Sequence, residues 1–222
     1  MPIRKILAPV QGTDTDKLVL NAALAIAKTF GAQAQAIFVR PDPSEALPYL
    51  GDGVSGQVIE DLLQAAKEGS DAASAKALKN LEDGAQAAGL PVVSGTSPLP
   101  SVRFMEVTGR QDLVVSEESR LSDLVIFAGA DASDGIAGGE ALEAALLSAD
   151  RPVLIAPKAA AKSIGTSIVI GWDGSMEASV AVSAAIPFIQ RANKVTILRI
   201  DEDEDDIHAT RMLETYLALH GA

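Results

Sequence analysis

An internal repeat constrains the fold of this chain more than any other feature of its sequence. Residues 5–14 (KILAPVQGTD) recur as residues 167–176 (SIVIGWDGSM), and each copy is an apolar run that leads into a Gly and a hydroxyl residue. An Ala-rich helical segment follows each run, and a second apolar run follows at residues 36–40 and 195–199. A period this long indicates two copies of one domain, and the order strand, helix, strand predicts a parallel sheet.

The first copy contains enough segments for a complete α/β domain. Apolar runs predict five strands, and amphipathic or Ala-rich segments predict the helices between them. The strands are expected at 3–10, 35–39, 103–107, 124–128 and 153–155, and the helices at 18–30, 58–88, 112–120 and 140–148. This alternation predicts a doubly wound, open, parallel five-stranded sheet of the Rossmann-like class. The 58–88 helix is expected to bury one apolar stripe, formed by Ile59, Leu62, Leu63, Ala66, Leu78 and Leu81.

The second copy is shorter. We assign residues 1–160 to the complete domain and residues 161–222 to a partial repeat with the order strand, helix, strand, helix. Because this repeat has no counterpart of the closing strands, we expect the 222 residues to be a shortened form of a longer tandem protein.

Composition narrows the classes of function. The formal net charge is −12, with 18 Lys and Arg against 30 Asp and Glu, which argues against nucleic acid and anionic membranes as partners. The absence of Cys excludes disulfides, thiolate catalysis and Cys-ligated metals. No segment resembles a secretion signal or a membrane span, so a cytoplasmic protein is expected. The acidic run 201–206 indicates either a metal or basic-partner site, or a solvated loop that caps the next helix.

Four segments of the chain form an ordered set: the opening run 5–13, the strand 122–129, the Gly-rich segment after it, and the closing run 151–155. Together they resemble the universal stress protein (UspA-like) family in its tandem form. The resemblance implies an adenine-nucleotide alpha hydrolase-like fold in a small cytoplasmic stress-response protein, usually a dimer. Some members of that family bind ATP and others have lost the nucleotide site.

The resemblance also places a candidate nucleotide site at the carboxyl ends of the strands, where doubly wound folds bind ligands. ATP-binding members carry an Asp after the first strand and a loop of the form Gly-x2-Gly-x9-Gly-Ser/Thr after the fourth. The residues at the corresponding positions here are Gln11 for the Asp, Gly129, Ala132 and Gly139 for the glycines, and Glu140 for the hydroxyl residue. The remaining candidates are Pro9, Val10, Gly12 and Val39 in the first copy and Asp173 in the second.

These departures predict a degenerate site that binds ATP or AMP weakly, if at all. Glu140 is expected at the start of a helix, where its carboxylate would take the positive end that a phosphate needs. Alternatively, the Gly-rich segment is only a flexible connection. Asp173 is expected to be a strand-end cap that bonds nearby backbone N–H groups rather than an adenine contact.

The sequence therefore favours a non-enzymatic stress-response module that binds a ligand or regulates a partner. We assign no catalytic residue, no metal ligand and no certain cofactor. An ATP-binding or nucleotide-hydrolysing enzyme on the same fold is the alternative, and a flavin-binding electron carrier is compatible with the fold but has no residue signature. The uncharged edge strand 153–156 predicts a homodimer, and the protein partner stays unknown.

Overall fold

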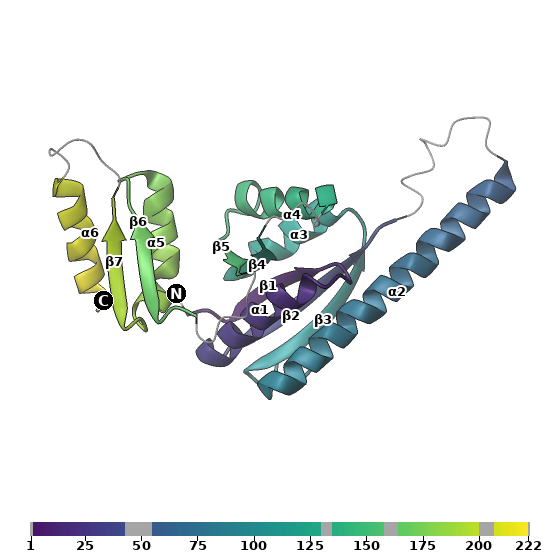
Figure 1. Cartoon of the computed structure of the whole chain (residues 1–222), viewed down its shortest axis with the longest axis horizontal. Helices are drawn as coiled ribbons and strands as arrows, with labels where there is room; N and C mark the ends of the chain where they lie inside the picture. The colour runs from purple at the N-terminus through teal and green to yellow at the C-terminus, as the bar shows by residue number, and fades with distance from the viewer. Residues whose placement is uncertain (1, 43–54, 130–134, 158–163, 200–206, 222) are drawn as a thin grey trace. The chain divides into compact units, whose positions relative to one another are not determined.

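The computed structural model describes residues 2–42, 55–129, 135–157, 164–199 and 207–221, with the side chains of 135–138 and 207–209 left out. The chain divides into two compact units, Ile3–Ala161 and Lys162–Ala222, each with its own sheet (Figure 1).

The first unit is built on one five-stranded sheet in which all pairings are parallel. The strand order is β3-β2-β1-β4-β5, so the direction of winding reverses between β1 and β4, where Ile6 pairs with Leu124. The strands are β1 (Lys5–Val10), β2 (Gln33–Arg40), β3 (Ser101–Thr108), β4 (Leu124–Ala128) and β5 (Val153–Ala156). This order confirms the predicted doubly wound parallel sheet.

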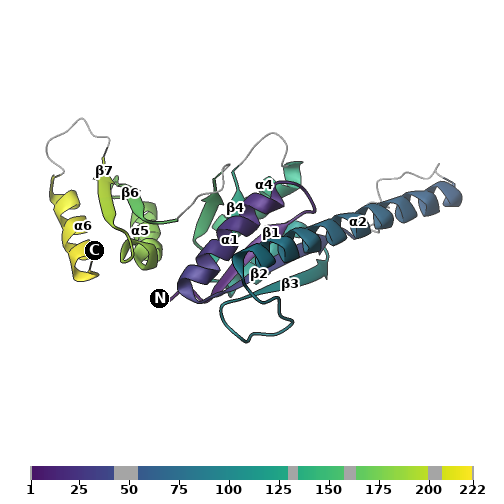
Figure 2. The same ribbon diagram turned by 60° about the horizontal axis from the view of Figure 1, so that its bottom comes forward.

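Two helices pack together on each face of this sheet (Figure 2). On one face lie α1 (Asp16–Phe30) and α2 (Gly56–Ala88), and on the other lie α3 (Gln111–Arg120) and α4 (Gly135–Leu147). Between the sheet and the helices α3 and α4 lies one continuous apolar core. Its buried residues are Leu7, Ile37, Val39, Val115, Val125, Phe127, Ala141 and Ala145. Gly31, with φ of 64°, ends α1 in the left-handed conformation, as expected from the sequence.

The predicted buried stripe of α2 is wrong for the first half of the helix. The buried positions are Ser74, Ala77, Leu81 and Ala85, all in the second half. Leu62 and Ala66 are exposed, and Ile59, Leu63 and Leu78 are only partly buried. The reason is tertiary: the first half of α2 extends past the sheet, so no strand lies beneath it (Figure 2).

The helix predicted at 140–148 begins earlier than expected. Because α4 starts at Gly135, the glycines at 135, 138 and 139 belong to a helix rather than to a flexible connection. Glu140 is the sixth residue of α4 and does not stand at its start.

The second unit has the order β6 (Ser167–Gly171), α5 (Met176–Ile189), β7 (Lys194–Leu198) and α6 (Ile207–Leu219). Its two strands pair in parallel. Ile170, Val182, Ile186, Ile189, Leu213 and Leu217 form its apolar core. The acidic run 201–206 lies outside the described residues, so its expected capping role is not tested. No described helix in either unit is long and apolar enough to cross a membrane.

Candidate functional site

The turn between β1 and α1 lies at the carboxyl end of β1, beside β4, where the strand order reverses. Two backbone N–H groups of this turn point at one carboxylate. The N–H of Gln11 donates to Oδ1 of Asp16 at 2.9 Å, and the N–H of Gly12 donates to Oδ2 at 2.8 Å. Asp16 therefore closes the turn that the resemblance marks as a nucleotide contact.

Asp16 is held in an enclosed position. The residue is only 3% exposed, and burial raises the pKa of its carboxyl group above the usual value, against the lowering effect of its hydrogen bonds. The hydroxyl of Thr13 donates a further, longer bond of 3.4 Å to Oδ1. The turn N–H groups thus already have an acceptor inside the protein and are not left for a ligand.

Helix α2 covers the same turn. Gly12 has φ of 76°, and a Cβ atom built on it would lie 2.3 Å from the carbonyl oxygen of Ala73 in α2. Two side chains of α2 also reach the turn: Asn80 Nδ2 donates to the Thr13 carbonyl at 3.3 Å, and Lys76 Nζ lies 3.2 Å from Asp14 Oδ1. Only glycine fits at position 12, because both the backbone conformation and the close approach exclude a side chain.

The other candidates from the first two strands belong mainly to the core. Val10 is buried, and Val39 is part of the apolar cluster under α3 and α4. Pro9 is partly buried and pairs with Ile37 across the sheet. The structure therefore gives Val10 and Val39 a packing role at the strand ends.

The candidates after β4 are spread along the chain. Gly129 is partly buried, and a Cβ atom on it would make an ordinary 3.5 Å contact with Ile155 Cγ2. Gly139 and Glu140 are exposed on α4, while Ala132 lies outside the described residues. The expectation that Glu140 blocks a helix start is wrong, because a residue in the second turn is past the free N–H groups of the helix end.

Asp173 has the local role expected from the sequence. Its Oδ1 accepts from the N–H of Ser175 at 2.9 Å, and the Ser175 hydroxyl bond is the main reason that the pKa of Asp173 is lowered. Ser175 in turn caps α5 by accepting from the N–H of Ala178 at 3.1 Å. This hydrogen bond agrees with the strand-end cap expected for Asp173 in the second copy.

Sequence reasoning missed a charged cluster at the ends of β2 and β3. Arg40 donates to Glu106 Oε1 from Nε at 2.8 Å and to Asp71 Oδ1 from Nη1 at 2.6 Å, and Ser74 Oγ donates to Glu106 Oε2 at 2.6 Å. The Ser74 bond, followed by Arg40, holds the pKa of Glu106 below its usual value, and Glu106 raises that of Arg40. No local pattern could have revealed this cluster, since its members come from three elements.

The sequence spacing around Asp16 would have misled. Thr13 and Asp16 are spaced as in a helix capping box, but the N-cap residue of α1 is Thr15, and Asp16 accepts from Gln11 and Gly12 instead. Within the described residues, no group of three or more His, Asp or Glu side chains is placed to hold a metal ion.

No protein-family model and no curated protein matches the sequence. Solved structures do match its fold. A universal stress protein from Archaeoglobus fulgidus DSM 4304 matches with a TM-score of 0.64 at 17% identity, covering 98% of this chain and 73% of that one. UspA from Lactobacillus plantarum matches with a TM-score of 0.50 at 17% identity, covering 71% of this chain and 99% of that one. The chain has the universal stress protein fold.

A third structure, of a functionally unknown protein from Pseudomonas aeruginosa PAO1, matches with a TM-score of 0.51 at 17% identity, covering 99% of this chain and 70% of that one. At these identities the likeness concerns the universal stress protein fold and not its ligands.

Proposed function

We propose that this chain is a universal stress protein of the tandem type that acts as a binding or regulatory module, without catalysis, and whose nucleotide site is degenerate. The fold, the internal repeat and the four sequence segments that resemble the family support this proposal together. We further infer a cytoplasmic protein from the composition.

The buried carboxylate of Asp16 is the observation that carries the proposal. It accepts the N–H groups of Gln11 and Gly12, which would otherwise point toward a ligand at the switch in strand order. A ligand that bonds to these N–H groups would have to displace the internal carboxylate first. Since a micromolar ligand has only about 8 kcal/mol of binding free energy in total, a triphosphate would be received poorly here.

The sequence after β4 also supports a degenerate nucleotide site. No Lys or Arg occurs between Leu121 and Asp150, so the segment after β4 supplies no cation for a phosphate. At the first strand, Gln11 stands where the family carries an Asp. An ATP-hydrolysing enzyme would need phosphate ligands and a base in these two places.

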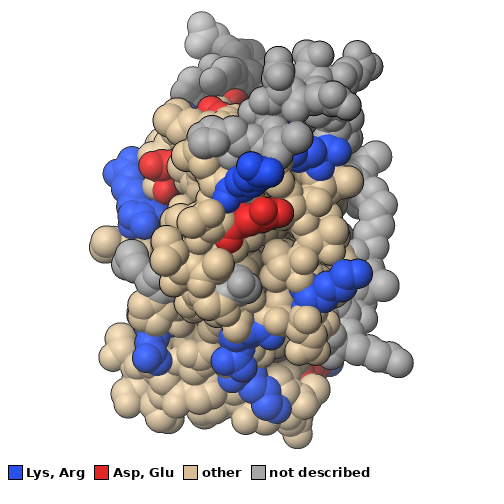
Figure 3. Space-filling view, turned by 90° about the vertical axis from the view of Figure 1, so that its left-hand side faces the viewer, with Lys and Arg blue, Asp and Glu red and all other residues tan. Residues whose placement is uncertain are grey.

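We also infer that nucleic acid is not a partner. The net charge of −12 repels a phosphate backbone. On the face shown in Figure 3, the Lys and Arg side chains are spread over the surface, with Asp and Glu side chains beside some of them in its upper half.

Analysis of small molecules that leave the denatured, freshly purified protein tests the proposal. We expect no adenine nucleotide at a level comparable to the protein, and no phosphate release from Mg-ATP above that of a heat-inactivated control. Nucleotide in a one-to-one ratio, or turnover of ATP by the native protein alone, would contradict the proposal and favour the enzyme alternative.

A further inference from the structure

One face of α2 changes from buried, mostly small residues to more exposed and charged residues where the helix extends past the sheet. Residues spaced three and four apart line this face along the helix, and in its second half they are the buried Ser74, Ala77, Leu81 and Ala85. In its first half the same face continues with Glu60, Leu63, Lys67 and Ser70. This continuation gives the first half of α2 a face that lies opposite the ends of β2 and β3.

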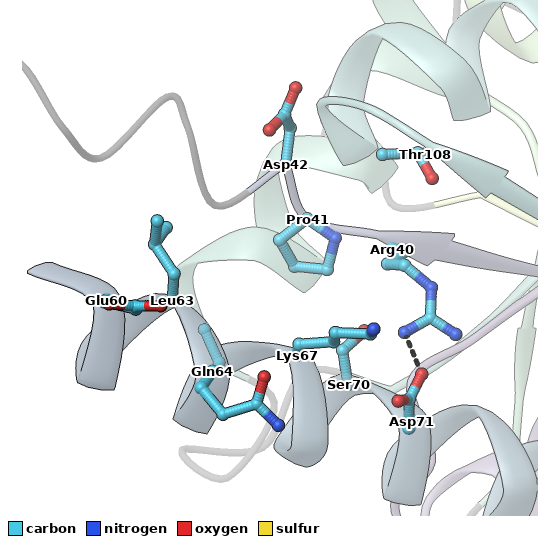
Figure 4. A pocket seen from close by; sticks show the side chains of 11 residues that line it. Arg40, Pro41, Asp42, Glu60, Leu63, Gln64, Lys67, Ser70, Asp71 and Thr108 are labelled. Atoms are coloured by element: carbon cyan, nitrogen blue, oxygen red, sulfur yellow. Dashed lines mark hydrogen bonds and ion pairs between the residues drawn. The ribbon is translucent and has the colours of Figure 1, made fainter.

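A pocket of about 540 Å³ lies between this half of α2 and the carboxyl ends of β2 and β3 (Figure 4). The strands contribute Arg40, which ends β2, with Pro41 and Asp42 after it, and Thr108, which ends β3. Helix α2 contributes the opposite wall, from Glu60 to Asp71. This volume is in the range of small-molecule sites.

The inner end of the pocket is fixed by the charged cluster. Arg40 is bonded to Glu106 and to Asp71, so the strand ends are tied to α2 at that point. The Asp71 carboxylate therefore already has a cationic partner. The pocket is distinct from the candidate nucleotide site in its residues, because none of the side chains that line it belongs to that site.

Three donors of the pocket have no partner among the described residues. The ammonium of Lys67 forms no ion pair there, and the hydroxyl of Thr108 makes no hydrogen bond there. The hydroxyl oxygen of Ser70 is buried without a hydrogen-bond partner, which costs free energy until an acceptor reaches it. Pro41, Leu63 and Ala66 supply apolar surface beside these donors.

We propose that this pocket binds a small organic acid: a single carboxylate, held by Lys67 and by the Ser70 hydroxyl, on an apolar body that packs against Pro41 and Leu63. A charge-assisted bond to the ammonium gives the acid its orientation. Asp42 and Glu60 also line the pocket, so a multiply charged phosphate is disfavoured and a singly charged ligand is preferred.

Titration with octanoate tests this site on the full-length protein. We expect calorimetry to give a dissociation constant of about 1 mM or tighter, since a carboxylate and a short apolar chain are both engaged. The Lys67→Gln variant should weaken binding by about tenfold, and Ser70→Ala by a smaller factor. Lys79→Gln is the matched control, because Lys79 is an exposed lysine on the same helix that does not line the pocket.

Octylammonium, which has the same chain and the opposite charge, should bind far more weakly than octanoate. In nitrogen–proton spectra of the protein, octanoate should shift the amide signals of Ser70 and Thr108. The proposal is overturned if octanoate shows no binding at about 10 mM, if octylammonium binds as tightly, or if the Lys67 and Lys79 variants behave alike. Shifts confined to other parts of the chain would overturn it too.

Discussion

The carboxylate of Asp16 and the absence of a Cβ atom at Gly12 determine the shape of the β1–α1 turn. Asp16 accepts the two turn N–H groups from inside the protein, and Gly12 allows the backbone of α2 to lie against the turn. Each residue has a measurable effect on stability, and the two effects have different physical origins.

The pH dependence of stability should report the burial of Asp16. Burial raises the pKa of Asp16 in the folded protein above its value of 3.8 in the unfolded chain, so folding favours the protonated carboxyl group. The stability that this difference contributes is fully present below pH 3.8 and is lost as the pH rises through the pKa of the folded protein. We predict that wild type gains stability relative to Asp16→Asn as the pH falls from neutral through this range. Urea unfolding of both proteins at several pH values measures this. If wild type instead loses stability relative to Asp16→Asn as the pH falls, the hydrogen bonds lower the pKa of Asp16 by more than burial raises it.

Replacement of Gly12 by Ala should destabilise the first unit by about 2–4 kcal/mol, since left-handed backbone strain and a clash with Ala73 add together. Gly89→Ala is the control. Its φ of 69° is similar, but a Cβ atom there meets nothing within 4 Å, so a loss of only about 1–2 kcal/mol is expected. Denaturant unfolding compares the two variants, and equal losses would show that α2 does not press on the turn.

At the scale of elements, the strands were predictable because each is a short apolar run bounded by turn residues. Strand β4 has the bounds that the run 124–128 predicts, and the helices α1 and α3 begin within two residues of the expected positions. Two element-scale expectations failed. The apolar residues in the first half of α2 have no strand beneath them, and the glycines of α4 are helical although Gly has a low helix propensity.

The candidate site was less predictable than the fold. The repeat and the strand order located the turn after β1, but sequence reasoning did not see that Asp16 fills it, because that depends on the path of the backbone. The cluster of Arg40, Asp71 and Glu106 joins residues far apart in the chain and has no local signature.

The two halves of α2 should differ in local stability. Residues 74–85 contribute buried side chains and residues 56–66 contribute none, so the first half has few contacts to oppose opening. We predict that amide hydrogens at 60–66 exchange much faster than those at 77–85. Hydrogen exchange followed by mass spectrometry or magnetic resonance measures this directly. Uniform protection along the helix would indicate that its first half is covered, for example by a partner.

At the scale of the whole molecule, β5 is an edge strand of the first sheet, and Ile155 in it is 49% exposed. Exposed, uncharged edges favour pairing with another chain, and two-fold contacts are the commonest result. We propose a homodimer through this edge. Light scattering at several concentrations should show a dimer that Leu154→Lys dissociates, whereas Leu113→Lys, at an exposed position on α3, leaves it intact. A monomer in all three proteins would contradict the proposal.

The degenerate nucleotide site is tested most directly by calorimetric titration of the full-length protein with Mg-ATP. The internal carboxylate at the β1–α1 turn and the lack of basic residues after β4 predict a dissociation constant in the high-micromolar range or weaker. Restoring the family's acidic residue with Gln11→Asp should strengthen binding. A low-micromolar constant for the wild-type protein, in a one-to-one ratio, would contradict the assignment of a degenerate site.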